Sequence, residues 1–241
     1  MKKYILLFLA FYSFSFIGNA QPPTFDDLII LYADGKYEKL IDECLKYNDK
    51  ESTAKEPIPY LYLAKGYYGM SQKGDRSAEY KNAFKSACQS LNKFYKKDKG
   101  ESFRAEDAEF IEKIKMAAAE VTMNEYESKN FKKSGTSALL FKKTSPNNLG
   151  ADFLNASSKF LDNDRSSAVA IWKEVEKPFM DLKELGTDSP ADLLIYKTAI
   201  IETVKCMIAS KQVDRAKKIA DKGQELIQEE EFKEELKALF N

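Results

Sequence analysis

The sequence contains no histidine in its 241 residues. Without histidine the chain cannot build a Ser-His-Asp or Cys-His catalytic arrangement, and it lacks the commonest general acid–base group and metal ligand. Gly66 and Gly69 lie within an apolar helical pattern and lead into no lysine–serine pair, so they do not form a phosphate-binding loop. These absences predict a chain with no cofactor, no metal site and none of the common enzyme mechanisms.

Cysteine is also scarce, with three residues at Cys44, Cys88 and Cys206. An odd number without metal-ligand spacing excludes a disulfide scaffold. Because each cysteine lies in an apolar helical context, we predict three small buried side chains. A Cys44–Cys88 bridge between neighbouring helices is the alternative.

An excess of charge of one sign is missing as well. Lysine plus arginine and aspartate plus glutamate each number 38. Loss of Lys2 and Lys3 with an N-terminal segment would leave the remaining chain slightly acidic. Nucleic acid and anionic membrane surfaces are therefore not expected as partners.

Long hydrophobic runs are absent apart from one at the N-terminus. The positively charged Met1-Lys2-Lys3 leads into the apolar run from Tyr4 to Ile17, which ends at the small residues Gly18-Asn19-Ala20. This pattern predicts a cleaved signal peptide over residues 1–20, since the run is shorter than the roughly 20 residues of a spanning helix. We expect export to the periplasm, or secretion, of one domain over residues 21–241 without a membrane span. A retained anchor is the alternative.

Proline and glycine are rare inside the long segments and cluster between them. Between these breaks apolar residues recur at spacings of three and four, as at Phe110, Ile114 and Ala117-Ala118, and no convincing alternating strand is present. The chain is therefore predicted to be all-α, with helices over 24–33, 37–47, 59–72, 78–96, 103–128, 131–143, 151–161, 166–176, 191–210, 213–228 and 229–240. Short polar turns such as Asp34-Gly35 join them into pairs over 24–50, 57–99, 101–148, 149–182 and 190–228, followed by a capping helix over 229–241.

Small and large residues recur at regular places in these pairs. In the second pair, Tyr60, Leu63-Ala64 and Tyr67 on the first helix are followed by Ala83 and Ala87 on the second. Comparable spacings occur at Ala156, Ala168 and Trp172, and at Ala216, Ala220 and Gly223. With helix–turn–helix units of this length, the pattern resembles the tetratricopeptide-repeat family. The resemblance implies a right-handed α-solenoid of about five degenerate helix pairs, whereas another helical stack or an irregular bundle would also explain the spacings.

The small residues have a steric role in such packing. Where two helices cross closely, a short side chain on one helix allows a large side chain of the other to fit. We predict this role for Ala64, Ala83, Ala156 and Ala216.

Carboxylate clusters are the remaining candidates for catalysis, because two suitably spaced acids suffice for glycoside hydrolysis. Asp26-Asp27 and Asp162 with Asp164 stand where helices start or turn, and Glu229-Glu230-Glu231 is typical of a solvated helix face. Asp162 and Asp164 also resemble the opening of a calcium loop, but the glycine and glutamate of such a loop do not follow. A structural role is the preferred interpretation of all three clusters.

A superhelix would expose the first helix of each pair on a concave surface. Residues one turn away from the packing positions would then form a partner-binding groove, namely Ile29, Tyr32, Lys65, Tyr68, Ser157, Phe160, Lys205 and Ile208. The bland alternative is that Tyr32, Tyr68 and Phe160 are ordinary half-buried aromatic residues.

Together these observations favour a non-catalytic protein–protein interaction module. We expect a protein or peptide partner, and a role as subunit or adaptor of a cell-envelope, secretion or outer-membrane assembly machine. The alternatives are a soluble carrier or chaperone-like protein that binds an apolar ligand or client in its groove and, less favoured, a carboxylate-dependent enzyme.

Overall fold

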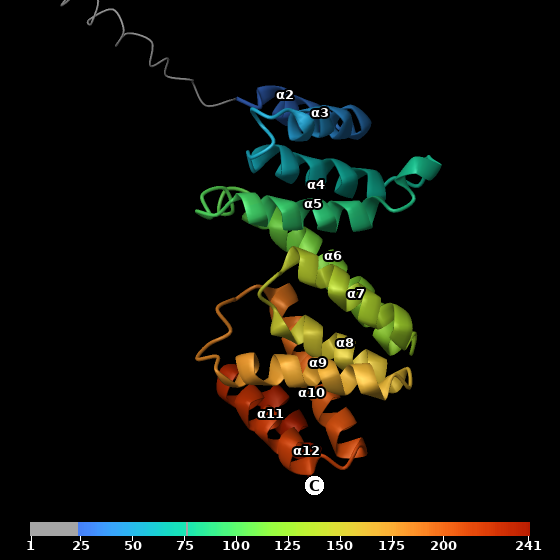
Figure 1. Cartoon of the computed structure of the whole chain (residues 1–241), viewed down its shortest axis with the longest axis vertical. Coiled ribbons are helices and arrows are strands. Elements are labelled where there is room, and N and C mark those ends of the chain that lie inside the picture. The colour runs from blue at the N-terminus through green and yellow to red at the C-terminus, as the bar shows by residue number, and fades with distance from the viewer. Residues whose placement is uncertain (1–23, 76) are drawn as a thin grey trace, which may run out of the picture.

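The computed structural model describes residues 24–75 and 77–241, and within these residues it contains helices and no strand (Figure 1). The prediction of an all-α chain is confirmed. The predicted signal peptide, residues 1–20, lies outside the described residues. The elements are α2 (Asp26–Ala33), α3 (Tyr37–Asp49), α4 (Ile58–Ser71), a short 3-10 helix η1 (Ala78–Tyr80), α5 (Ala83–Lys97), α6 (Ala108–Glu127), α7 (Phe131–Thr144), α8 (Leu149–Leu161), α9 (Arg165–Met180), α10 (Pro190–Ala209), α11 (Val213–Leu226) and α12 (Glu230–Ala238). No helix of this described part is long and apolar enough to cross a membrane.

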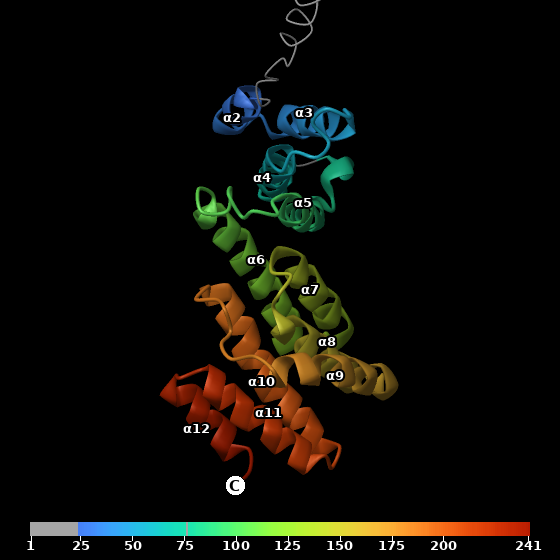
Figure 2. The same ribbon diagram turned by 60° about the vertical axis from the view of Figure 1, so that its left-hand side comes forward.

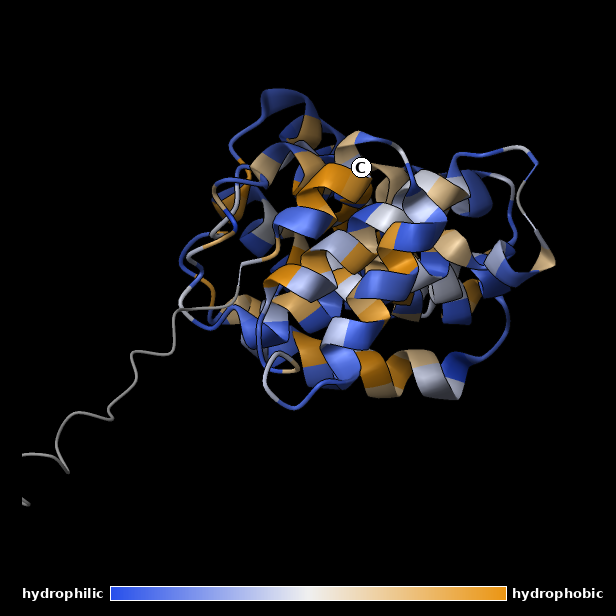
Figure 3. Cartoon of the chain, turned by 90° about the horizontal axis from the view of Figure 1, so that it is seen from above, coloured by the Kyte–Doolittle hydropathy of each residue, from blue (hydrophilic) through white to orange (hydrophobic). Residues whose placement is uncertain are grey.

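The helices form an elongated stack with α2 and α3 at one end and α11 and α12 at the other (Figures 1 and 2). Helices that follow one another as predicted pairs pack together: α2 with α3, α4 with α5, α6 with α7, α8 with α9, and α10 with α11. In the first half of the stack, α2 to α5, the order of packing follows the chain, because α3 also packs on α4. Figure 3 shows the hydrophilic connections between helices around the periphery of the stack.

The second half departs from a linear array. Helix α6 packs on α7, α7 on α8, α8 on α10, and α10 returns to pack on α6, so that these helices close into a ring. The hydroxyls of Ser157 on α8 and Thr203 on α10 form a buried hydrogen bond of 2.9 Å, and Tyr126 on α6 donates a 2.6 Å hydrogen bond to Glu202 on α10. In a simple solenoid each pair contacts only its neighbours. Here the third pair also contacts the fifth.

The predicted packing positions are confirmed by their burial. Ala64, Ala83, Ala156 and Ala216 are all buried at helix contacts. At Gly150 the approach of α8 to α10 is closer still, because a Cβ atom added there would lie 2.9 Å from the Cα atom of Tyr196. Small residues therefore set the helix spacing, as ridge-and-groove packing requires.

Three helix boundaries differ from the predicted ones by more than two residues. The segment predicted as one helix over 78–96 is divided into η1 and α5, and the helix predicted from residue 103 begins at Ala108. The helix predicted to end at residue 176 continues to Met180 and contains Pro178. Proline has no N–H, so Pro178 leaves the carbonyl of Glu174 without its helical hydrogen bond, yet the helix continues for two more residues.

The two ends of the stack expose different surfaces. At the C-terminal end, α12 buries Phe232 and Leu236 and turns its charged residues outward. At the other end, Ile29 and Ile30 of α2 are 50% and 60% exposed. The C-terminal helix thus closes the core with a polar outer face, as terminal units of helical stacks do, whereas α2 leaves apolar side chains in solvent.

All three cysteines are buried free thiols, which confirms the predicted small buried side chains. Burial raises the pKa of Cys88 and of Cys206 to about 12, and it also raises the pKa of Cys44. The thiolate is the reactive form of cysteine, and it is scarce at neutral pH when the pKa is this high.

We therefore expect a thiol-specific alkylating reagent to leave all three cysteines of the native chain unmodified under conditions that fully modify the denatured chain. Mass spectrometry of the intact protein and of its peptides measures the modification. Rapid modification of any one cysteine in the native chain would contradict its burial in a stable helix contact.

Candidate binding cleft

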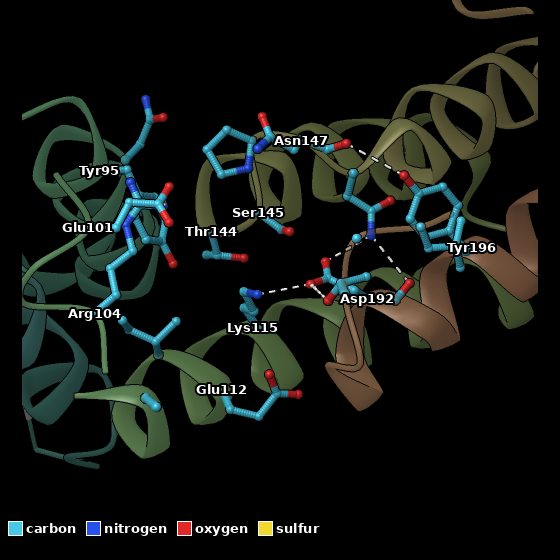
Figure 4. Close-up of a pocket in the computed structure, with 18 of the residues that line it drawn as sticks. Tyr95, Glu101, Arg104, Glu112, Lys115, Thr144, Ser145, Asn147, Asp192 and Tyr196 are labelled. Atoms are coloured by element: carbon cyan, nitrogen blue, oxygen red, sulfur yellow. Dashed lines mark hydrogen bonds and ion pairs between the residues drawn. The ribbon is translucent and has the colours of Figure 1, made fainter. Parts of the chain in front are cut away.

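A cleft of about 590 Å³ lies where the first half of the stack meets the second (Figure 4). Its residues come from α5, from the connection between α5 and α6, from the first half of α6, from the α7–α8 turn, and from the α9–α10 connection with the start of α10. The lining includes the side chains of Tyr95, Lys96, Glu101, Arg104, Ala108, Ile111, Glu112, Lys115, Ser145, Asn147, Asn148, Thr187, Asp192 and Tyr196. Its volume is within the range of pockets that hold small ligands or a few residues of a partner.

Asp192 in the first turn of α10 is the central charged residue of the cleft. It is only 2% exposed, and Lys115 Nζ on α6 approaches its carboxylate to 2.9 Å. The amide of Asn148 donates a 2.8 Å hydrogen bond to the same carboxylate, and the Thr187 hydroxyl donates one of 3.1 Å. The carboxylate thus ties together α6, the α7–α8 turn and the α9–α10 connection.

The pKa of Asp192 is lowered from its ordinary value. Burial by itself raises this pKa, but the positive charge of Lys115 and hydrogen bonds from Ser145, Lys115 and Asn148 outweigh burial. Asp192 therefore remains ionised at neutral pH, and it cannot serve as a general acid there.

Glu112 is a second carboxylate of the lining, and it is partly buried. One of its oxygens accepts a 2.7 Å hydrogen bond from the Ser189 hydroxyl, and the other accepts a 3.1 Å bond from the backbone N–H of Ala191. Both donors belong to the N-terminus of α10, where unpaired N–H groups and the helix dipole favour a negative charge. Glu112 thus caps α10 from the neighbouring helix α6.

One wall of the cleft is built from Tyr95 at the end of α5 and Arg104 in the following connection. The guanidinium carbon of Arg104 lies 5.0 Å from the centre of the Tyr95 ring, and Arg104 Nη1 approaches Glu101 to 2.6 Å. Arg104 Nε and the buried Asp98 carboxylate are 3.5 Å apart and form no hydrogen bond. This wall is therefore held by few strong contacts of its own.

The opposite wall is built from the α7–α8 turn. Asn148 caps α8 by accepting a 3.2 Å hydrogen bond from the N–H of Ala151, and the Tyr196 hydroxyl accepts one of 3.0 Å from Leu149 N–H. Burial raises the pKa of Tyr196 to about 12, so its hydroxyl stays protonated. The Tyr196 hydroxyl also donates a 3.5 Å hydrogen bond to the backbone carbonyl of Asn147, whose side chain is exposed.

The chemistry that this arrangement offers is recognition of a polar group. The charged residues of the lining comprise the cations Lys96, Arg104 and Lys115 and the anions Glu101, Glu112 and Asp192, so their charges balance. Glu112 and Asp192 are already occupied by structural hydrogen bonds. In the described part of the chain, no cluster of three potential metal-ligating side chains occurs.

The residues predicted for a partner-binding groove do not line this cleft, and they differ in exposure. Ser157 is fully buried and Lys65 is 7% exposed, so neither lies on an open face as expected. The physical reason is the same in both cases, because a helix distant in sequence covers the side chain: α10 covers Ser157, and α6 covers Lys65.

The other predicted groove residues are half-buried or exposed. Tyr32 is half-buried near Lys65, with 5.1 Å between its ring centre and Lys65 Nζ. Half-buried Tyr68 packs on Phe84 and Phe110, half-buried Phe160 packs on Trp172, and Ile208 packs against the core. Ile29 and Lys205 are exposed. Tyr32, Tyr68 and Phe160 are thus half-buried aromatic residues, as the alternative interpretation of the sequence predicts.

Sequence patterns did not single out the cleft residues, because about half of them belong to turns and connections and the others lie on helices that are far apart in the sequence. Ser145-Pro146-Asn147-Asn148 and the segment from Thr187 to Asp192 are clusters of turn-forming polar residues, which indicate loops but not that two loops meet. The one available signal was the number of polar residues with side-chain amides or hydroxyls in both loops.

Comparison of the chain with models of protein families, with curated proteins and with solved structures gives no match.

Proposed function

We propose that this chain is a non-catalytic interaction module that binds a protein or peptide partner in the cleft between the two halves of its helical stack. As a working scheme the chain consists of degenerate tetratricopeptide-like helix pairs arranged as a right-handed solenoid whose second half closes on itself. It acts in the periplasm, after removal of residues 1–20, as a subunit or adaptor of a cell-envelope, secretion or outer-membrane assembly machine.

The observation that carries this proposal is the state of the two carboxylates beside the cleft. A carboxylate-based hydrolase needs one acid that can give up a proton and one that is free to attack or to activate water. Asp192 has a lowered pKa and is engaged by Lys115, Asn148 and Thr187, while Glu112 caps α10. Both acids are thus engaged in holding the fold together, which supports binding rather than acid–base chemistry.

The polar lining also supports a polypeptide partner over an apolar ligand. A carrier for an apolar molecule needs a closed apolar cavity, whereas this cleft presents amides, hydroxyls and balanced charges. Such groups can satisfy the backbone N–H and C=O groups of a bound segment, and an aromatic–arginine pair such as Tyr95 and Arg104 is typical of residues that contribute strongly to interfaces.

A bulky residue in the cleft tests the proposal. Ala108 is an exposed first residue of α6 that lines the cleft, so Ala108→Trp should fill part of it without disturbing the core. The control is Ala170→Trp, an exposed helical alanine of α9 that is outside the cleft. We expect Ala108→Trp to weaken partner capture about tenfold, a loss of roughly 1.4 kcal/mol, and Ala170→Trp to leave it unchanged.

The measurement is affinity purification of each tagged variant from gently cross-linked cells of the protein's own organism, with quantification of the proteins that co-purify. A stoichiometric set of envelope proteins that is lost only with Ala108→Trp would support the proposal. Purification of the wild-type chain alone, or equal capture by both variants, would contradict it.

A further inference from the structure

Lys65 of α4 has an unusual environment for a lysine. Its side chain is buried, and its ammonium group lies near three aromatic rings that belong to three different helices: 5.1 Å from the ring centre of Tyr32 on α2, 4.5 Å from that of Tyr62 on α4 and 5.7 Å from that of Phe110 on α6. A buried ammonium group is costly unless it is paired, and aromatic faces supply part of the compensation.

The carboxylate that pairs with Lys65 is that of Asp107. Asp107 is the residue immediately before α6, and its side chain forms no capping hydrogen bond with that helix. The Lys65–Asp107 ion pair thus joins the start of α6 to α4. A second contact follows one turn later, where the rings of Tyr68 and Phe110 meet edge to face at 6.0 Å.

This attachment lies directly behind one wall of the cleft. Asp107 ends the connection that carries Glu101 and Arg104, and the next residues of α6, Ala108 and Ile111, also line the cleft. The contacts of Arg104 are weak restraints, because its partner Glu101 is 68% exposed, its Nε lies 3.5 Å from the Asp98 carboxylate without a hydrogen bond, and its bond from Nη2 to the Asp98 carbonyl is long at 3.3 Å. The position of this wall thus depends on the buried contact behind it.

We propose that Lys65 is a positioning residue for the cleft: by holding Asp107 within the group of Tyr32, Tyr62 and Phe110, it sets the wall from Glu101 to Glu112. Because Tyr32 belongs to the first helix pair, this contact also couples the N-terminal end of the stack to the cleft. That Lys65 affects partner binding rests on the proposed function, whereas its role in fixing the position of the wall does not.

Replacing Lys65 by methionine tests the positioning role, because methionine retains an unbranched apolar side chain without the charge. We expect the backbone amides of residues 101–112 to exchange hydrogen about tenfold faster in Lys65→Met than in the wild-type chain, while the amides of α8 and α10 exchange at unchanged rates. Hydrogen exchange followed by mass spectrometry of the full chain measures both regions. Lys65→Arg retains the charge and the contact with aromatic faces, so residues 101–112 should exchange as slowly in this variant as in the wild-type chain.

The outcomes separate this inference from the proposed function. Unchanged exchange in residues 101–112, equal acceleration throughout the chain, or failure of Lys65→Arg to restore protection would overturn the positioning role. If Lys65→Met accelerates exchange only in residues 101–112 and also reduces partner capture about tenfold, both statements are supported. If the exchange result is obtained but Ala108→Trp leaves partner capture unchanged, the positioning role stands and the proposed binding cleft is wrong.

Discussion

Asp192→Ala is expected to lower the free energy of unfolding by about 3–5 kcal/mol, the usual cost of breaking a buried ion pair by removing one partner. The substitution leaves the largely buried ammonium group of Lys115 without its counter-charge, and it removes the acceptor of the Asn148 and Thr187 hydrogen bonds. Urea denaturation followed by circular dichroism measures the change. Asp188→Ala, at an exposed aspartate of the same connection, is the control and should change stability by less than about 0.5 kcal/mol.

Asp192 should also make the stability of the chain depend on pH. Because the pKa of Asp192 is lower in the folded chain than in the unfolded chain, the unfolded chain binds more protons on acidification. The stabilisation from ionised Asp192 is therefore present above the unfolded pKa of about 3.9 and is lost as pH falls through the lower folded pKa. We expect the loss of stability between neutral pH and about pH 3 to be smaller in Asp192→Asn than in the wild-type chain. An equal loss in both would show that Asp192 does not contribute to the pH dependence.

Trp172→Ala should destabilise the chain by about 3–5 kcal/mol, because it empties a large volume of a tightly packed core. Trp172 of α9 is fully buried, and its ring lies 5.6 Å from that of Phe160 on α8. Its indole N–H has no hydrogen-bond partner among the described residues. Trp172→Phe retains an aromatic ring and removes this unsatisfied donor, so the smaller cavity is partly offset and the expected loss is below about 2 kcal/mol.

Thermal or urea unfolding monitored by circular dichroism compares the two variants, because tryptophan fluorescence is lost in both. Equal destabilisation by phenylalanine and alanine would indicate that the indole N–H contributes a favourable interaction. A loss below about 1 kcal/mol for Trp172→Ala would indicate that the core around α9 collapses to fill the space.

Local patterns were sufficient to place the helices. Apolar residues repeat with helical spacing in each segment, and turn residues such as Asp34-Gly35 stand between the segments, so the order of the helices could be predicted from short stretches of chain. Helix ends were less predictable. Phe103 has the apolar character expected on the buried face of a helix, yet α6 begins at Ala108, where Asp107 is attached to Lys65 of α4.

The site could not be predicted in the same way. Lys115 and Asp192 are 77 positions apart, and they meet because α10 returns to pack on α6. The same return covers Ser157, which the spacing along α8 placed on an open face. A periodic pattern indicates which residues share a helix face, but it does not indicate which distant helix covers that face.

The sequence by itself determined that the chain is helical, that Ala64, Ala83, Ala156 and Ala216 are buried at helix contacts, and that chemistry based on histidine is absent, because these features depend on residue type and local spacing. The tertiary structure decided that α6, α7, α8 and α10 close into a ring, that the turns beside them form a polar cleft, and that Lys65 is enclosed by Tyr32, Tyr62 and Phe110. The physical reason is that burial and ion pairing depend on contacts between segments far apart in the chain, and the energy of each such contact exists only after the intervening helices have packed.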